Sequence, residues 1–565
     1  MHAQSWQDRA AAKRASILAE IPAEWRLAQA DIDRAEKQRV LVGPFMEQLL
    51  DPETVSIVNQ DSVPLVEAIK SRAYTSEQVT RAFCKTAAVA HQIDPCLLEF
   101  FPASAIERAQ ELDRYLAENG RPMGPLHGLP VSLKDQFHVK GLDTTMGYVG
   151  WIGGNLGSKD PSEAHKLESL LVTDLLALGA VLYCKTSVPQ TLMIGETVNN
   201  ILGQTFNPHN RLLSSGGSSG GEGALMALRG STIGLGTDIG GSVRIPAAFS
   251  GIFSLKPTPE RVSYRGMANT NPGQNTYRST VGPMGTSIEG VELMFRSLLT
   301  TEPWLRDPSV VPIPFRQDVM DSYLSRADKN GTATDRPLKI GVLWTNNIVQ
   351  PHPPVSRGIK MLVDAIRKAG HKVVDWNPPN HGPAYDTHLW FIGADGGDDV
   401  HSHLARSGEP VIPIVAHAYA VRREAEPLLE YQKRTVQGLE YEAGYSDYWN
   451  STAEDDGQIV DAVIMPVAAH AAVIPGQYYD NHYGEVINLL NYSAGVIPIT
   501  KADKNVDVPN TAYQPKSSVD KLNWESYDAE VYDGAPVGLQ IVGRKFEEEK
   551  ILAIMQIVYA ALQKA

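Results

Sequence analysis

Residues 214–258 form the most distinctive stretch of this chain, SSGGSSGGEGALMALRGSTIGLGTDIGGSVRIPAAFSGIFSLKPT. Glycine and serine are far denser here than elsewhere, yet apolar residues are interleaved with them, which is not typical of a flexible linker. Gly240-Gly241-Ser242 follows the apolar run 232–235. Consecutive glycines let backbone N–H groups converge without obstruction by Cβ atoms, as an oxyanion hole requires. The stretch therefore predicts either such a turn at Ser242 or a set of tight turns between buried elements.

Two other interpretations of this stretch have less support. Residues 216–220 satisfy the G-x-S-x-G pattern of a nucleophile elbow, but that motif follows a buried strand. The preceding residues, FNPHNRLLS, contain polar groups and a proline. A phosphate-binding loop would need G-x-x-x-x-G-K-[ST], which this stretch lacks, and Lys256 is the only lysine nearby.

The composition excludes several classes of protein. The chain has 565 residues, of which 43% are hydrophobic, so most of it can fold. A formal net charge of −14 disfavours a nucleic-acid partner. No apolar run approaches the roughly 18 residues of a membrane helix, and the amino terminus lacks the apolar core of a secretory signal. Three cysteines without CxxC spacing disfavour a disulfide framework. We therefore expect a cytoplasmic protein with no membrane insertion and no nucleic-acid partner.

Helix and strand patterns alternate along most of the chain. Thr75 and Gln78 form a capping box that predicts a helix through Ala90, and further helices are expected over 167–178, 355–366 and 546–562. Short apolar runs typical of strands occur at 180–183, 340–343, 373–374, 462–467 and 537–542. The alternation predicts an α/β fold with a largely buried sheet. We expect a helical arm over residues 1–70 and one large domain over 71–565.

The stretch 214–258 resembles the signature of the amidase signature family of serine hydrolases. The similarity includes the interval between its two serines and the trailing Lys-Pro-Thr. Upstream, GLPVSLKD at 128–135 is similar to the lysine motif of that family, and KTSVPQ at 185–190 and PVGLQIVGR at 536–544 are further marks. The resemblance spans most of the chain and is nearest to the fungal acetamidase or general amidase branch. It implies a large mixed central sheet covered by helices on both faces, with residues 71–565 as the catalytic domain.

The resemblance also implies a Ser-Ser-Lys triad made by Ser242, Ser218 and Lys134. Ser242 would attack an amide carbonyl, and Ser218, which follows a cis peptide bond in this family, would pass the proton to Lys134. Lys134 must be uncharged to accept that proton. Because a free lysine titrates near about 10.4, burial must favour the neutral form. Asp135 would oppose this if it pointed inward, so we expect it to face away.

Further roles around the triad follow from the same resemblance. The expected oxyanion hole consists of four successive backbone N–H groups, those of Ile239, Gly240, Gly241 and Ser242. Asp238 and Arg244 flank this turn and would pair to brace it, although an ordinary loop ion pair fits the sequence equally well. Ser219 and Thr237 are expected to hydrogen-bond the catalytic groups from behind.

The predicted activity is hydrolysis of carboxylic acid amides to the acid and ammonia or amine through an acyl-serine intermediate, without cofactor or metal. Small aliphatic amides such as acetamide are favoured. Met193 and Ser218 are expected to contact the substrate, with core packing as the alternative for Met193. The alternatives are an aryl or fatty-acid amide hydrolase, the latter usually requiring a membrane-binding apolar helix, and a non-catalytic binding protein. The branch also suggests a homodimer.

An acidic, histidine-containing cluster raises the question of a metal site. Its members are Asp395, Asp398, Asp399, His401 and His403. Such ligands suit divalent cations, but the Gly396-Gly397 turn favours a solvated loop. We therefore expect no metal here. The family resemblance implies instead that this cluster lines the substrate pocket, since members of the family contribute substrate contacts from this later region.

Overall fold

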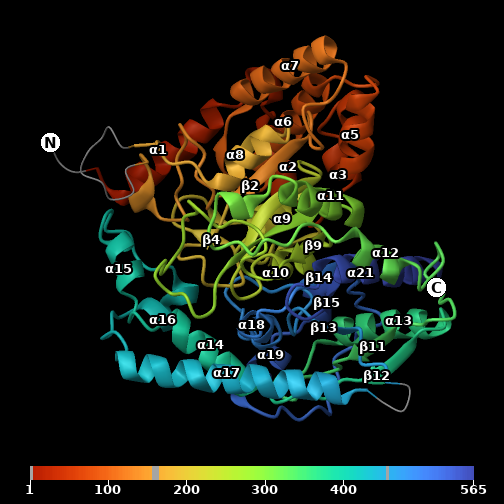
Figure 1. Ribbon diagram of the computed structural model, residues 1–565. Helices are drawn as coiled ribbons and strands as arrows, with labels where there is room; N and C mark the ends of the chain where they lie inside the picture. Colours follow the sequence, from red (N-terminus) through yellow and green to blue (C-terminus); the bar gives the residue numbers. More distant parts are fainter. Residues whose placement is uncertain (1–3, 155–163, 454–456) are drawn as a thin grey trace.

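The computed structural model describes residues 4–154, 164–453 and 457–565. Within these ranges an 11-stranded sheet runs through the molecule in the order β1-β3-β2-β8-β10-β9-β14-β15-β13-β11-β12 (Figure 1). Its strands are β1 (Leu97–Phe100), β2 (Pro130–Lys134), β3 (Val181–Thr186), β8 (Ile233–Asp238), β9 (Phe253–Lys256), β10 (Thr280–Gly285), β11 (Lys339–Val342), β12 (Lys372–Asp375), β13 (Ala462–Pro466), β14 (Ala494–Lys501) and β15 (Pro536–Val542). Short strands also pair as β4 (Val198–Asn199) with β5 (Gly203–Gln204) and β6 (Phe206–Asn207) with β7 (Asn210–Ser214).

The helices of the described residues surround this sheet. They are α1 (Trp6–Ala19), α2 (Gln29–Glu36), α3 (Pro44–Glu47), α4 (Pro52–Val58), α5 (Ser62–Lys70), α6 (Ser76–Ile93), α7 (Pro102–Asn119), α8 (Leu170–Ala177), α9 (Gly220–Ala227), α10 (Arg244–Ser250), α11 (Ile288–Leu299), α12 (Gln317–Leu324), α13 (Pro353–Lys368), α14 (His381–Ile392), α15 (Asp398–Leu404), α16 (Ala416–Tyr419), α17 (Leu428–Ser451), α18 (His482–Leu489), α19 (Ser518–Glu525), α20 (Ala529–Tyr532) and α21 (Glu548–Lys564). In the part of the chain that the structure describes, none of them combines the length and apolar character needed to cross a bilayer.

The sheet is mixed, as predicted. Strand β2 is parallel to both β3 and β8, and β11 is parallel to both β12 and β13. The strands between these two parallel groups, from β8 to β13 along the sheet, pair antiparallel. The parallel strands β2 and β8 lie side by side near one edge of the sheet. Strand β2 carries the lysine motif and β8 belongs to the 214–258 stretch, so the two motifs meet at neighbouring strands.

Helices cover both faces of the sheet, and two glycines show how closely they approach. Gly495 pairs with Ile541, so Gly495 and Gly538 face opposite sides because side chains alternate along a strand. A Cβ atom at Gly495 would lie 2.1 Å from the Met555 sulfur of α21. One at Gly538 would lie 2.6 Å from the Cα of Ala248 on α10. Helices α21 and α10 therefore pack tightly against opposite faces, and α10 follows directly after Ser242.

Most predicted elements are confirmed, with shifted boundaries. The capping box of Thr75 and Gln78 is formed at the start of α6, and Gly179 ends the α8 region with a positive φ of 87°. The predicted start of α8 is wrong, because the helix begins at Leu170 and Leu167 is 53% exposed before it. Phe546 likewise precedes α21.

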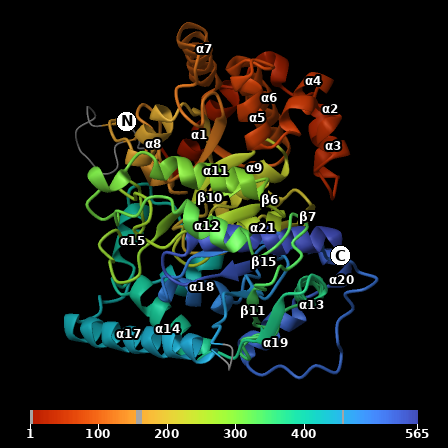
Figure 2. The same cartoon turned by 45° about the vertical axis from the view of Figure 1, so that its right-hand side comes forward.

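Helices α1–α5 lie within residues 4–70. Ile17, Leu41 and Leu65 of this segment belong to the same buried cluster as the central strands. Both views place α2–α5 beside α6 and α7 at one end of the molecule, with α17 at the other end (Figures 1 and 2). The boundary at residue 70 stays a prediction.

Candidate active site

Lys134, at the end of β2, contacts two hydroxyl groups. Its side chain is completely buried. The Nζ atom lies 2.7 Å from the Ser218 Oγ and 2.8 Å from the Thr237 Oγ1, which belongs to β8. Ser218 follows the cis Gly217–Ser218 peptide bond, as the family resemblance implied, and it is 1% exposed. The two motifs that lie far apart in sequence therefore meet inside the protein.

The charge state of Lys134 follows from its surroundings. Burial lowers the pKa of its amine to about 7, although the carboxylates of Asp238 and Glu222 act in the opposite direction. In the described residues no carboxylate forms an ion pair with this amine, so its charged form has no direct counter-ion. A substantial neutral fraction near pH 7 is what a proton acceptor requires.

Asp135 faces away from Lys134, as expected, but it is buried rather than exposed. Its Oδ1 lies 2.7 Å from the Nζ of Lys185, also fully buried, on β3. Its Oδ2 accepts hydrogen bonds from the backbone N–H and the hydroxyl of Thr145, at 2.8 Å and 2.6 Å. The Asp135 carboxylate therefore pairs with Lys185 and not with its neighbour Lys134.

The turn that carries Ser242 is organised by Asp238, the last residue of β8. Its carboxylate accepts the backbone N–H groups of Gly241, at 2.9 Å, and Val243, at 3.1 Å, and pairs with Arg244 at 3.0 Å. Burial alone would raise the pKa of Asp238. The Arg244 guanidinium and the hydrogen bonds that the Asp238 carboxylate accepts nevertheless hold that pKa well below the ordinary value. The pairing of Asp238 with Arg244 is thus present, and it shapes the turn.

The expected oxyanion donors are only partly available. The N–H of Gly241 is taken by Asp238. Within the described ranges, the N–H groups of Ile239, Gly240 and Ser242 have no hydrogen-bond acceptor. The structure therefore differs from the expectation of four donors, because the turn needs one of them to hold its own shape.

Ser242 and Ser219 are linked through the backbone. The N–H of Ser219 donates to the carbonyl of Ser242 at 3.1 Å, which brings the two serine-bearing turns together. The Ser219 hydroxyl itself has no partner in the described part of the chain, so Ser219 contacts the turn of Ser242 through its main chain and not through the expected side-chain hydrogen bond. The Ser242 hydroxyl likewise makes no side-chain hydrogen bond to the described residues. Ser242 is 8% exposed and faces a cavity.

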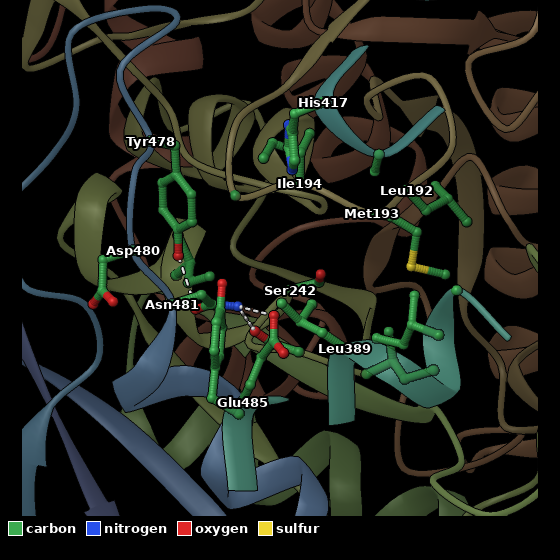
Figure 3. A pocket seen from close by; sticks show the side chains of 18 of the residues that line it. Leu192, Met193, Ile194, Ser242, Leu389, His417, Tyr478, Asp480, Asn481 and Glu485 are labelled. Carbon is green, nitrogen blue, oxygen red and sulfur yellow. Dashed lines mark hydrogen bonds between the residues drawn. The ribbon is translucent and has the colours of Figure 1, made fainter. Parts of the chain in front are cut away.

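This cavity has a volume of about 250 Å³. Its apolar lining residues include Leu192, Met193, Ile194, Leu389 and Ile392. Its polar lining residues include Tyr385, Tyr478, Asp480, Asn481 and Glu485. Figure 3 shows Ser242 close to Asn481 and Glu485, with Leu192, Met193 and Leu389 across from them. Met193 therefore stands in the wall, where it was expected to contact substrate, whereas Ser218 is absent from the described lining residues.

A family model described as "Amidase" matches residues 78–552. The chain belongs to the amidase signature family. This amidase is 42% identical over 561 residues to an acetamidase of Aspergillus oryzae, and the match covers 99% of both chains. It is also 42% identical over 555 residues to an acetamidase of Emericella nidulans, which covers 98% of both. A solved structure of a fatty acid amide hydrolase is similar with a TM-score of 0.90 and 30% identity, over 99% of this chain and 95% of that one. The chain is an amide hydrolase.

The acidic cluster at 395–403 does not line the cavity beside Ser242, so that prediction is wrong. The amidase instead uses His403 in packing, since its ring contacts Tyr148 and Trp151 and its Nδ1 accepts the Trp151 N–H at 3.1 Å. His403 also lies 3.2 Å from Asp399. Among the described residues no group of three or more His, Cys, Asp or Glu side chains is arranged to hold a metal ion.

Sequence reasoning missed the polar wall of the amidase. Asn481 and Glu485 lie at the start of α18, about 240 residues after the turn that they face, and no short motif surrounds them. The only available signal is compositional: YYDNHYGE at 478–485 places several polar and aromatic groups before an apolar helix.

Proposed function

We propose that this amidase cleaves carboxylic acid amides to the acid and ammonia or amine through an acyl-serine intermediate on Ser242. The observation that carries the proposal is the 2.7 Å contact between the Lys134 Nζ and the Ser218 Oγ, at a buried amine whose pKa is lowered by burial to about 7. A neutral lysine bonded to a serine hydroxyl is a proton acceptor for a nucleophile.

The orientation of the Lys134 amine follows from a chain of hydrogen bonds behind it. The Gln136 amide donates through Nε2 to the carbonyl of Ala268 at 2.7 Å, so its Oε1 is left to accept. Thr237 donates its single hydroxyl hydrogen to that Oε1, at 2.5 Å. The Thr237 oxygen can therefore only accept from Lys134, which leaves the lone pair of the neutral amine available to accept from Ser218.

The reaction then proceeds by a balanced proton relay. The Ser242 Oγ attacks the amide carbon as its proton passes to the Ser218 Oγ, while the Ser218 proton passes to Lys134. The negative oxygen that forms is stabilised by the free N–H groups of Ile239, Gly240 and Ser242. When the C–N bond breaks, the relay returns the proton to the leaving nitrogen. Water then attacks the acyl-serine along the same path and restores Ser242.

Small aliphatic amides are the first candidate substrates, because two relatives with 42% identity are named acetamidase. Longer aliphatic or aryl amides are the second candidate. The apolar lining residues Leu192, Met193, Ile194 and Leu389 offer apolar surface that such a longer acyl group would contact. A fatty-acid amide hydrolase would usually need a membrane-binding apolar helix, and none was expected from the sequence. In the structure, however, helix α17 exposes the apolar residues Leu428, Leu429, Val436 and Leu439.

Covalent labelling with a fluorophosphonate probe tests the nucleophile. We expect modification of Ser242, with Ser242→Ala showing neither labelling nor ammonia release from an amide panel that runs from acetamide to long-chain and aryl amides. Ser250→Ala is a matched control, because it removes another buried hydroxyl of the same segment, one without a hydrogen-bond partner. Labelling at Ser218 or Ser219 would instead support a nucleophile elbow, and an unlabelled, inactive protein would support the binding-only alternative.

A further inference from the structure

One face of α18 is turned toward the Ser242 turn. Asn481, Glu485 and Asn488 are spaced four and three residues apart, so they project from the same side of the helix start. The Asn488 amide donates to Asp238 at 2.9 Å and accepts from Arg244 at 2.6 Å. The helix is thus bonded directly to the ion pair that organises the turn.

The approach of α18 to the turn depends on a glycine. A Cβ atom at Gly484 would lie 3.1 Å from the carbonyl oxygen of Gly240 and 2.5 Å from the Oδ1 of Asn481. Any larger residue at 484 would therefore push the helix away from the turn or displace the Asn481 amide. This close approach places Asn481 within direct reach of the backbone beside Ser242.

The Gly240–Gly241 peptide group is held at both of its ends. Its carbonyl oxygen accepts a hydrogen bond from the Asn481 Nδ2 at 2.7 Å. Its N–H donates to Asp238 at 2.9 Å. Because a peptide group is planar, two bonds on opposite edges fix its rotation about the chain. Glycines on both sides of this plane would otherwise let it rotate more freely than other residues, and Gly241 already has a φ of 113°.

The Asn481 amide is itself held in one orientation (Figure 3). Its Nδ2 donates to the Glu485 Oε1 at 2.9 Å, and its Oδ1 accepts from the Tyr478 hydroxyl at 2.9 Å. The Glu485 Oε2 lies 3.0 Å from the Nδ1 of His388 on α14. A flipped Asn481 amide would set its oxygen against both a carbonyl and a carboxylate, which is unfavourable.

We propose that Asn481 is a positioning residue for the oxyanion site and that Glu485, supported by His388, holds Asn481 in place. The bond to the Gly240 carbonyl keeps the adjacent N–H groups of Gly240 and Ser242 aimed into the cavity. The proposal rests on the proposed function, since it assumes that these N–H groups stabilise the negative oxygen formed on attack by Ser242. Asn481 acts through the backbone and not through contact with the acyl group.

The test compares ground-state and transition-state binding in Asn481→Ala. A positioning role predicts that kcat falls about 10- to 100-fold, since misaligned donors lose part of the 10²–10³-fold effect of an oxyanion donor. KM should stay within about twofold. The inhibition constant of a trifluoromethyl ketone, which forms a tetrahedral adduct with serine, should rise by the same factor as kcat falls. The inhibition constant of the product carboxylate should not change. Asn380→Ala, which removes the N-cap hydrogen bond of α14 at an exposed site, is the matched control and should behave as wild type.

Three outcomes overturn the inference. Wild-type kinetics in Asn481→Ala would show that the peptide is held without it. A parallel loss of product binding would show that Asn481 contacts the substrate instead. If Asn481→Ala does not fold, Glu485→Gln, which preserves volume, should lower kcat and ketone affinity in proportion by about threefold or more. If neither kcat nor ketone affinity changes in Glu485→Gln, the proposed role of Glu485 is contradicted. The Asn481 and Glu485 variants should still be labelled at Ser242, which shows that the nucleophile is intact. Failure of the proposed function is a different result, because it would appear as turnover in Ser242→Ala.

Discussion

Lys134 and Asp135 are consecutive in the chain, yet each is paired with a different group: the Lys134 Nζ lies 2.7 Å from the Ser218 Oγ, and the Asp135 Oδ1 lies 2.7 Å from the Lys185 Nζ. All three ionisable side chains are completely buried, and the one carboxylate among them pairs with Lys185. Because Lys185 takes that carboxylate, Lys134 is left with hydroxyl partners, and burial lowers its pKa. The ion pair beside the site is a condition for the proton acceptor within it.

Replacement of Asp135 by asparagine should show how much the buried ion pair with Lys185 stabilises the protein. Asp135→Asn leaves Lys185 buried without its counter-ion, and loss of one partner of a buried pair typically costs about 3–5 kcal/mol of unfolding free energy. Denaturant unfolding measures the loss. Asp364→Asn is the control, because its pair with Lys360 on α13 is exposed and should contribute less than about 1 kcal/mol. Equal stabilities of the two variants would contradict the importance of the buried pair.

The activity should depend on the protonation of Lys134. With a pKa lowered by burial to about 7, kcat/KM should rise with pH through about 7 and then level off. A rate that is flat between pH 5 and 9 would contradict the role of this amine.

The unfolding free energy should also depend on pH because of the lowered pKa of Lys134. A lysine whose pKa is lower in the folded state contributes stability above its ordinary value of 10.5, and that contribution is lost as pH falls through about 7. Lys134→Met should therefore gain stability relative to wild type as pH is lowered from 10 toward 7, measured by denaturant unfolding at each pH. Parallel curves for the two proteins would show that the amine is not desolvated in the folded state.

Glu196 joins two walls of the cavity. Its carboxylate accepts the N–H of Gly476, at 3.0 Å, and of Tyr478, at 3.2 Å, so it connects segment 192–195 to segment 478–481. Burial raises its pKa to about 7, against the effect of these hydrogen bonds. A raised pKa contributes stability that is fully present below about 4.5 and is lost as pH rises through about 7.

Glu196→Gln should remove this part of the pH dependence. The difference in unfolding free energy between wild type and variant should shift in favour of the variant between pH 5 and 8. The exposed Glu67→Gln on α5 should leave the profile of the wild type unchanged. A Glu196→Gln profile that runs parallel to wild type would mean that the carboxylate is not titrating in this range.

Replacement of Met193 distinguishes a role in substrate contact from a role in core packing. If Met193 contacts the acyl group, Met193→Ala should raise the kcat/KM ratio of hexanamide to acetamide by about tenfold, the effect of one or two methylene groups in a pocket. If it only packs the core, the variant should lower the melting temperature and leave that ratio unchanged. Met361→Ala, a half-exposed methionine on α13, controls for loss of a methionine as such.

The sequence was most informative where neighbouring residues act together. The turn at 238–244 could be anticipated because Asp238, the glycines and Arg244 lie within seven residues, and glycine is needed where backbone amides converge. The family resemblance implied the mixed sheet, and periodicity predicted the regions of helices α6, α8, α13 and α21 and of strands β3, β11, β12, β13 and β15. The start of α8 was misplaced because Leu167 continues the apolar spacing although Ser169 already stands before the helix.

The cavity could not be predicted in the same way. Its walls come from segments near residues 193, 389, 419 and 481, and their proximity results only from how the strands are ordered in the sheet. The 395–403 cluster was expected at the pocket because members of the family contribute substrate contacts from this later region. In the structure it is the residues just before it, at 389–393, that reach the cavity. A resemblance over a long region does not specify which residues of a loop face a distant turn.

The groups proposed to move the proton all lie between residues 134 and 242, on or beside β2 and β8, whereas most of the cavity wall lies beyond residue 384. Most of the cavity wall is therefore encoded apart from the groups proposed to move the proton, although Leu192, Met193 and Ile194 lie among them. Descendants of such a protein can acquire new substrates through changes in the later part while the inherited reaction is preserved. For enzyme engineering, chimeras that exchange the later segments between relatives are the natural route to altered preference.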